Sequence, residues 1–181
     1  MPISAEQVKK LREVTGVGVM EAKKALVEHQ GDFEAAVIAL RQTGVSKAVE
    51  KTDRVAAEGV IGSYVHTNKQ VAAFLSLNCE TDFVARTDDF QRLAKDIAMH
   101  IAALAPRYLS RDSIPNDLLD RDPSLLETVL LDQPFVKDES QTVGELIKSS
   151  IHRLGENIQI TNFAYFAVKG PSSCTVNPKT Q

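Results

Sequence analysis

The sequence lacks tryptophan, and its two cysteines, Cys79 and Cys174, lie far apart and outside any Cys-x-x-Cys pattern. This cysteine usage excludes a zinc cage built from thiolates and a disulfide-dense secreted scaffold. An excess of basic charge is also missing, because 21 Lys and Arg residues stand against 24 Asp and Glu, for a formal net charge of -3. Domains that bind nucleic acid by bulk attraction are usually basic, so we expect no direct nucleic-acid partner.

Long hydrophobic runs are missing as well. No stretch reaches the roughly 18 consecutive apolar residues of a membrane helix, and the starting segment MPISAEQVKK has no apolar region typical of a signal peptide. We therefore expect no membrane partner and a cytoplasmic location. The 43% of apolar and 25% of charged residues are ordinary for a globular protein, and 181 residues suffice for one compact domain with a small addition.

Signatures of catalysis and of metal binding are absent too. None of the four histidines lies in a His-Glu-x-x-His pattern or has an acidic residue or cysteine at a ligand spacing. Gly16 and Gly18 lack the third glycine of a dinucleotide-binding loop, and they follow an expected helix instead of a strand. The residues predict no catalytic group and no metal site. An enzyme whose site is assembled from distant residues stays as the weakest alternative.

The N-terminal region shows the patterns of three short helices. Ser4 and Gln7 form a capping box ahead of apolar residues at helical spacing. The expected helices run from Ser4 to Thr15, from Val19 to about His29 and from Asp32 to Gln42, with Gly44 as the final stop. We expect a three-helix module over residues 1–44 and a short helical or semi-rigid linker over residues 45–58.

The pattern changes after the linker. Two runs rich in β-branched and aromatic residues, 60–66 and 71–77, flank a polar turn and predict a β-hairpin. A third run over residues 158–168 predicts another strand. Helices are expected over residues 88–105, capped by Asp88 or Asp89 and ended by Pro106, and from Thr142 to Leu154, with Gly155 as the stop.

Helices and strands that do not alternate strictly favour an α+β fold with an antiparallel sheet. We expect this core to cover residues 59–169. The polar residues 170–181 are expected to form a disordered tail.

One connection between a strand and a helix stands out, the segment from Asn78 to Arg86. Thr81 is a candidate N-cap for a short helical turn, which places Phe83 near the tip of a charged connection. Phe83 then has two interpretations. The more common one is that its ring folds back into the core beside Leu77 and Phe90. The other is an apolar anchor that enters a pocket of a partner protein, and the residues alone leave both open.

Five segments, in order along the chain, resemble signatures of the bacterial elongation factor Ts family. They are TGVGVMEAKKAL (15–26), NCETDFVAR (78–86), IAMHIAA (97–103), QPFV (133–136) and LGENI (154–158). Together they indicate a resemblance that extends over residues 4–168.

The resemblance implies a guanine-nucleotide exchange factor for elongation factor Tu, with a ubiquitin-associated-like three-helix module and an α+β core. It implies that Asp82 and Phe83, framed by Thr81 and Val84, enter the nucleotide-binding domain of Tu and disturb its Mg²⁺ region. The residues implied to contact the same domain are Arg12, Val19, Met20, Lys23 and His100. No covalent chemistry and no cofactor is implied for this chain, because Mg²⁺ and the guanine nucleotide belong to the partner.

The sequence departs from the family between about Asp117 and Leu131, where it is shorter and lacks the usual Lys-Pro and Glu-Gly-Arg. It also lacks the second core repeat of larger members. Short members tend to dimerise through the core, so a homodimer is a hypothesis for this chain. The alternative function is a pure interaction module, in which the three helices bind helical partners and the core is a dimerisation scaffold.

Overall fold

The computed structural model describes residues 3–49 and 51–176. The chain divides into two compact units. The helical unit consists of Met1–Asp53 with Lys148–Gly155, and the α+β unit consists of Arg54–Ile147 with Glu156–Gln181.

The helical unit contains three helices, α1 (Ala5–Thr15), α2 (Val19–Glu28) and α3 (Phe33–Val49), together with the later residues of α7 (Val143–Leu154). The predicted capping box is present, since the Ser4 hydroxyl accepts from the Gln7 N–H and the Gln7 side chain accepts from the Ser4 N–H. Gly16 ends α1 in the left-handed region at φ 72°. The three predicted helices are thus confirmed, with one change at the end of α3.

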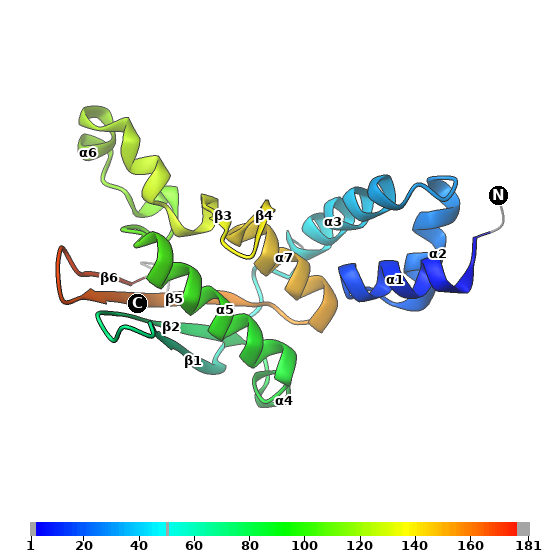
Figure 1. Ribbon diagram of the computed structural model, residues 1–181, viewed down its shortest axis with the longest axis horizontal. Coiled ribbons are helices and arrows are strands. Elements are labelled where there is room, and N and C mark those ends of the chain that lie inside the picture. Colours follow the sequence, from blue (N-terminus) through cyan, green and yellow to red (C-terminus); the bar gives the residue numbers. More distant parts are fainter. Residues whose placement is uncertain (1–2, 50, 177–181) are drawn as a thin grey trace. The chain divides into compact units, whose positions relative to one another are not determined.

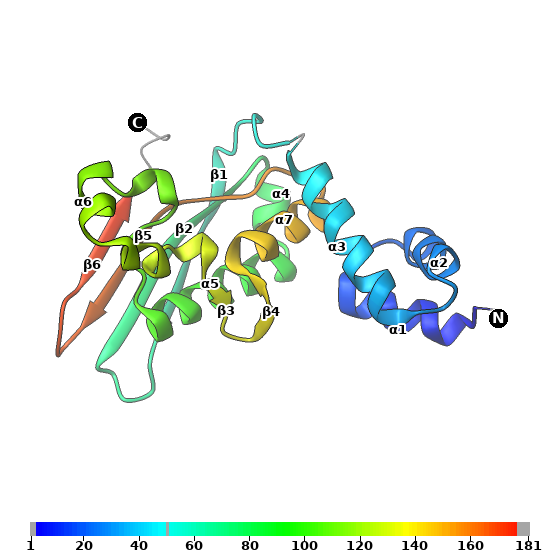
Figure 2. The ribbon, with the colours of Figure 1, turned by 90° about the horizontal axis from the view of Figure 1, so that it is seen from above.

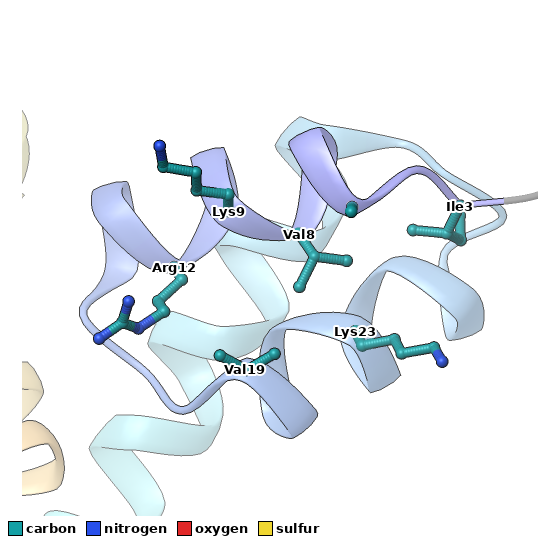
Figure 3. A pocket seen from close by; sticks show the side chains of 7 residues that line it. Ile3, Val8, Lys9, Arg12, Val19 and Lys23 are labelled. Carbon is teal, nitrogen blue, oxygen red and sulfur yellow. The ribbon is translucent and has the colours of Figure 1, made fainter.

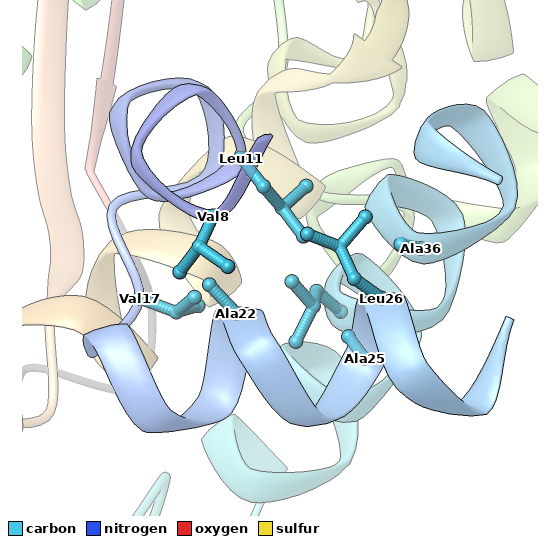
Figure 4. Packing of buried hydrophobic residues seen from close by; sticks show 8 residues of the cluster. Val8, Leu11, Val17, Ala22, Ala25, Leu26 and Ala36 are labelled. Carbon is cyan, nitrogen blue, oxygen red and sulfur yellow. The ribbon is translucent and has the colours of Figure 1, made fainter. Parts of the chain in front are cut away.

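The core of the helical unit is small and rich in alanine (Figure 4). Leu11 and Leu26 are fully buried in it, beside the small buried side chains of Ala22, Ala25 and Ala36. Since few apolar atoms are buried, each large side chain carries a substantial share of the unit's stability.

Helix α3 does not end at Gly44, as the sequence predicts, but continues to Val49. A helical glycine costs about 1 kcal/mol relative to alanine. Here the glycine is buried, and a Cβ atom at residue 44 would lie 3.6 Å from the His152 Cβ, at an ordinary van der Waals distance. Close packing against α7 therefore overrides the intrinsic tendency of glycine to stop the helix. The first residues of the predicted linker are helical as a result.

The α+β unit is built on a four-stranded antiparallel sheet in the order β1-β2-β5-β6 (Figure 2). The strands are β1 (Glu58–Val65), β2 (Val71–Cys79), β5 (Gln159–Ala167) and β6 (Ser173–Val176). The predicted hairpin, third strand and α+β class are confirmed. Strand β6 lies within the predicted tail, so the prediction of disorder is wrong for residues 173–176, which pair with β5. Residues 177–181 lie outside the described part of the chain.

Helix α5 (Asp88–Leu104) covers one face of this sheet and contacts β1 and β2 (Figure 1). Its buried side chains include Phe90, Ile97 and Ile101, which follow the predicted helical spacing. The cap is Thr87, whose hydroxyl accepts from the Phe90 N–H, and not Asp88 or Asp89. The two aspartates instead lie in the first turn, where the positive end of the helix dipole stabilises their negative charges.

The segment between α5 and α7 forms a small layer of its own. It contains α6 (Asn116–Arg121), three 3₁₀ turns at Arg111–Ser113, Pro123–Thr128 and Leu130–Asp132, and a strand pair, β3 (Pro134–Phe135) with β4 (Asp138–Thr142). A satellite cluster of Ile114, Leu125 and Val129 holds it together. In the part of the chain that the structure describes, no helix has the length and apolar character to cross a membrane.

Candidate functional site: an exposed aromatic tip and an apolar cleft

The connection after β2 forms the predicted tip. Thr81 caps the short helix α4 (Asp82–Ala85), and its hydroxyl accepts from the Val84 N–H at 3.4 Å. The Phe83 side chain is 81% exposed, whereas Ala85 in the same turn is buried. Of the two interpretations left open by the sequence, the one in which Phe83 folds back beside Leu77 and Phe90 is therefore wrong. A ring exposed on a structured turn, instead of a loose loop, is suited to enter a pocket of another molecule.

The tip is held by a carboxylate that lies far from it in the sequence. Glu156 accepts hydrogen bonds from the backbone N–H of Glu80 at 3.1 Å and of Thr81 at 3.0 Å. It also accepts from the Thr81 hydroxyl at 2.6 Å. Hydrogen bonds to an ionised acceptor are about twice as strong as neutral ones. Glu156 therefore fixes the backbone immediately before the Asp82–Phe83 pair.

A second carboxylate, that of Glu80, connects the tip back to the segment that contains Glu156. Glu80 accepts from the Asn157 N–H at 2.6 Å, and the Arg54 guanidinium lies 3.6 Å from the same oxygen. The Asn157 side-chain amide donates to the Arg54 carbonyl at 2.7 Å. These hydrogen bonds and the ion pair thus connect the segments around residues 54, 80 and 156 at the base of the tip.

The buried residue Cys79 also supports the tip. Its thiol donates to the Thr81 carbonyl at 3.1 Å. Burial, together with the nearby charge of Glu156, raises the pKa of the Cys79 thiol to about 11. The thiol is therefore protonated at neutral pH and retains the hydrogen that this contact needs, and it is a poor nucleophile.

The charged pair at the tip is accessible to solvent. Asp82 forms a 3.0 Å ion pair with Arg86 one turn further along, and the Asp82 side chain is half-buried whereas that of Arg86 is exposed. Such a pair contributes little to stability in water. Asp82 can therefore exchange Arg86 for a donor on a partner at small cost.

In the helical unit, three of the predicted contact residues line one cleft between α1 and α2 (Figure 3). The cleft has a volume of about 330 Å³ and is lined by Ile3, Ala5, Val8, Lys9, Arg12, Val19 and Lys23. Its floor is apolar, and its three cationic side chains are exposed. Met20, also a predicted contact residue, is 77% exposed and follows Val19 on α2. This combination suits a partner surface that has apolar and acidic side chains.

His100 does not belong to either surface. It is fully buried, its Nε2 lies 3.1 Å from Gln133 Oε1, and its Nδ1 accepts from the Val136 N–H at 3.2 Å. Burial lowers the pKa of His100 below its usual value, so the ring is neutral at pH 7. The expectation of a partner contact by His100 does not fit this position. The His100 side chain instead attaches the small layer after α5 to that helix.

No chemical centre accompanies these surfaces. Within residues 3–49 and 51–176, no three His, Cys, Asp or Glu side chains converge in a way that could hold a metal ion. Apart from the buried His100, the predicted site residues form two groups in different units, with Thr81, Asp82, Phe83 and Val84 in one turn and Arg12, Val19, Met20 and Lys23 at or beside the α1–α2 cleft. Both groups consist largely of exposed side chains on helices or turns, which is the form of a binding surface.

The supporting residues Glu80, Glu156 and Asn157 were not singled out from the sequence, although they lie in the segments NCETDFVAR and LGENI. The sequence separation of 75 residues between Thr81 and Glu156 hides their contact. The signal for this contact in the sequence is the position of Glu156, an acidic residue that follows the helix stop Gly155 and precedes the next strand.

The fold and this site define a class: an α+β protein with an N-terminal helical unit and an exposed aromatic tip that hydrogen bonds hold in place. Comparison with known proteins agrees with that class. A family model described as Elongation factor TS matches residues 5–127. An elongation factor Ts from Syntrophomonas wolfei is 44% identical over 193 residues, which cover 92% of this chain and 90% of that protein. One from Thermosipho melanesiensis is 40% identical, with 92% of this chain and 98% of the relative covered.

A larger relative, the elongation factor Ts of Synechococcus sp. (strain JA-3-3Ab), is 43% identical, with 93% of this chain and 70% of the relative covered. The chain belongs to the elongation factor Ts family.

Proposed function

We propose that the chain is a guanine-nucleotide exchange factor that binds elongation factor Tu in its GDP form and promotes GDP release. The observation that carries the proposal is Phe83, 81% exposed on a turn fixed by three hydrogen bonds to one carboxylate. Membership of the elongation factor Ts family supports elongation factor Tu as the partner. Under this proposal the protein acts in the cytoplasm as a translation factor and makes or breaks no covalent bond.

The proposed mechanism is a wedge. Asp82 and Phe83, framed by Thr81 and Val84, enter the nucleotide-binding domain of the partner and shift the groups that hold Mg²⁺. Because Mg²⁺ demands near-ideal octahedral geometry, a small displacement of its ligands removes much of the nucleotide's affinity. By linkage, a factor that binds the nucleotide-free state best is itself weakened by nucleotide. GTP binding would then release the factor. Mg²⁺ and the nucleotide belong to the partner, and this chain contributes no cofactor.

The helical unit acts, in this proposal, as a ubiquitin-associated-like docking module. Arg12, Val19, Met20 and Lys23 contact the same domain of the partner. Val19 and Met20 are 54% and 77% exposed, and such apolar exposure supports a contact surface.

The test is the release of a fluorescent GDP analogue from elongation factor Tu, with and without this protein. Acceleration that rises to a plateau with factor concentration is expected. If the protein binds Tu and leaves the release rate unchanged, the exchange proposal is wrong and the interaction module is favoured.

A homodimer through the core is a second part of the proposal. The sheet face that carries Ile61, Phe74 and Phe166 has these side chains 67%, 39% and 51% exposed, and the two phenylalanine rings meet edge to face at 6.3 Å. A second copy of the chain would remove this apolar face from water. Light scattering checks it, and a mass equal to the monomer at micromolar concentration would remove the hypothesis.

A further inference from the structure

We propose that Glu156 is a positioning residue for exchange, because it holds Phe83 in the orientation needed to enter the partner. This inference rests on the proposed function. It concerns a residue that needs no contact with the partner and acts only through the backbone of the tip.

The geometry of Glu156 supports this role more strongly than a general structural one. Its two oxygens receive three donors, at 3.1, 3.0 and 2.6 Å, and all three come from the two residues that immediately precede Asp82. The Thr81 hydroxyl that donates to Glu156 also accepts from the Val84 N–H. A single hydroxyl thus links the carboxylate to the first turn of α4, which carries Phe83.

The tip is held at both ends of α4, because Ala85 is buried at its C-terminal end and Glu156 fixes the two residues before its first turn. Helix α4 has only four residues, and Phe83 itself packs little because it is largely exposed. A helix this short is unstable unless its ends are satisfied. The hydrogen bonds from the tip to Glu156 therefore supply much of the order that an inserting side chain requires.

Glu80 adds contacts in the reverse direction, from the tip to the segment that contains Glu156. Its carboxylate accepts from the Asn157 N–H at 2.6 Å and faces Arg54 at 3.6 Å, while its own N–H donates to Glu156. Arg54 and Glu156 are also the residues at which the chain passes into the α+β unit. Through their hydrogen bonds and the ion pair, Glu80 and Glu156 connect both of these boundary positions to the base of the tip.

The decisive variant is Glu156→Gln, which keeps the volume of the side chain. The amide nitrogen of the introduced side chain cannot accept a hydrogen bond. One of the two acceptor oxygens is therefore replaced by a donor, which faces the N–H and O–H donors of the tip. We expect the maximal rate of GDP release at saturating factor to fall about tenfold, below the roughly 100-fold loss that a misplacement of about 1 Å can cause. The half-saturating concentration should change less than twofold. Asp96→Asn is the matched control, because Asp96 is a carboxylate of the same unit, 22% exposed and paired with Lys137 at 2.7 Å.

A double-mutant cycle separates positioning from a general structural role. If Glu156 acts through Phe83, the double variant Glu156→Gln with Phe83→Ala should release GDP no more slowly than Phe83→Ala alone. A general structural role would multiply the two losses. A maximal rate of Glu156→Gln equal to the unmodified protein, or losses that multiply, would overturn the inference.

Two further measurements guard against unfolding and against failure of the proposed function. Glu80→Gln keeps all three bonds to Glu156 and weakens only the contacts to Asn157 and Arg54, so a loss of about threefold in the same rate is expected. Amide exchange of the free protein should show protected Glu80 and Thr81 N–H groups that lose protection in Glu156→Gln. If the unmodified protein fails to accelerate release, the proposed function falls. If these amides exchange freely in the unmodified protein, the fixing of the tip by Glu156 is itself refuted.

Discussion

The tip of the α+β unit and the cleft of the helical unit differ in how their side chains are held. At the tip, one exposed ring extends from a backbone that is fixed by hydrogen bonds donated to the Glu156 carboxylate. At the cleft, exposed side chains such as Arg12 and Lys23 extend from regular helices above a small apolar core. The difference suggests a division of labour. Under the proposed function, a projection fixed by hydrogen bonds suits the step that deforms the partner, and an exposed cationic rim suits the step that captures it.

The largest expected effect concerns the core beneath the cleft. Leu26→Ala should lower the stability of the helical unit by about 2–5 kcal/mol, because Leu26 is fully buried in a small cluster. Hydrogen exchange measures it, as protection should fall in α1 and α2 and remain in β2 and α5. Leu118→Ala is the control, since this half-exposed residue of α6 should cost about 0.5 kcal/mol or less. Equal loss of protection in both units would show that they do not differ in this way.

The next effect concerns the tip. Phe83→Ala should reduce the maximal rate of GDP release about thirtyfold, equivalent to about 2 kcal/mol, the usual threshold for an interface anchor. Its Tm should stay unchanged, because the ring is 81% exposed in the free protein. Val168→Ala, which truncates another exposed apolar side chain of this unit, serves as the control. A change in the half-saturating concentration alone would assign capture, and not deformation, to the tip.

A smaller effect is expected for the cations of the cleft. Arg12→Ala and Lys23→Ala should each raise the half-saturating concentration about threefold and leave the maximal rate unchanged, because rim charges act on encounter more than on the final complex. The effect should shrink as salt is added. Lys24→Ala is the matched control, since Lys24 lies on α2 outside the cleft and pairs with Glu28 at 3.7 Å. Loss of maximal rate in these variants would contradict the division of labour.

The smallest effect is a dependence of stability on pH in the α+β unit. Burial lowers the pKa of His100, so the unfolded chain takes up a proton at a higher pH than the folded chain. The free energy of unfolding should therefore fall as the pH drops below about 6.5, the pKa of an unperturbed histidine. Urea unfolding across this range checks it. His100→Gln should flatten the dependence, and His66→Gln, a change at an exposed histidine, should leave it as it is.

Local signals predicted most of the elements. The Ser4–Gln7 capping box, the hairpin around residues 67–70 and the Thr81 cap depend on neighbours a few residues apart, and all three are present. Errors arose where distant packing decides. Helix α3 passes through Gly44 because that glycine lies close against His152, and no local pattern reveals this contact.

The candidate site divides in the same way. The sequence singled out Thr81–Val84 and placed Phe83 near a tip, but it left open whether the ring faces the core or the solvent. It also offered His100 as a contact residue, which the fold buries against Gln133. The supporting carboxylates were hidden because Glu80 and Glu156 meet only when β5 pairs with β2.

The sequence by itself determined that this protein is α+β with an N-terminal group of helices, because helix caps, turn residues and apolar spacing act over a few residues. The tertiary structure alone decided that Phe83 faces solvent, that His100 does not, and that Glu156 holds the tip. The physical reason is that exposure and hydrogen-bond partners depend on which distant segments fill the space around a side chain. Residue order constrains that only through the complete fold.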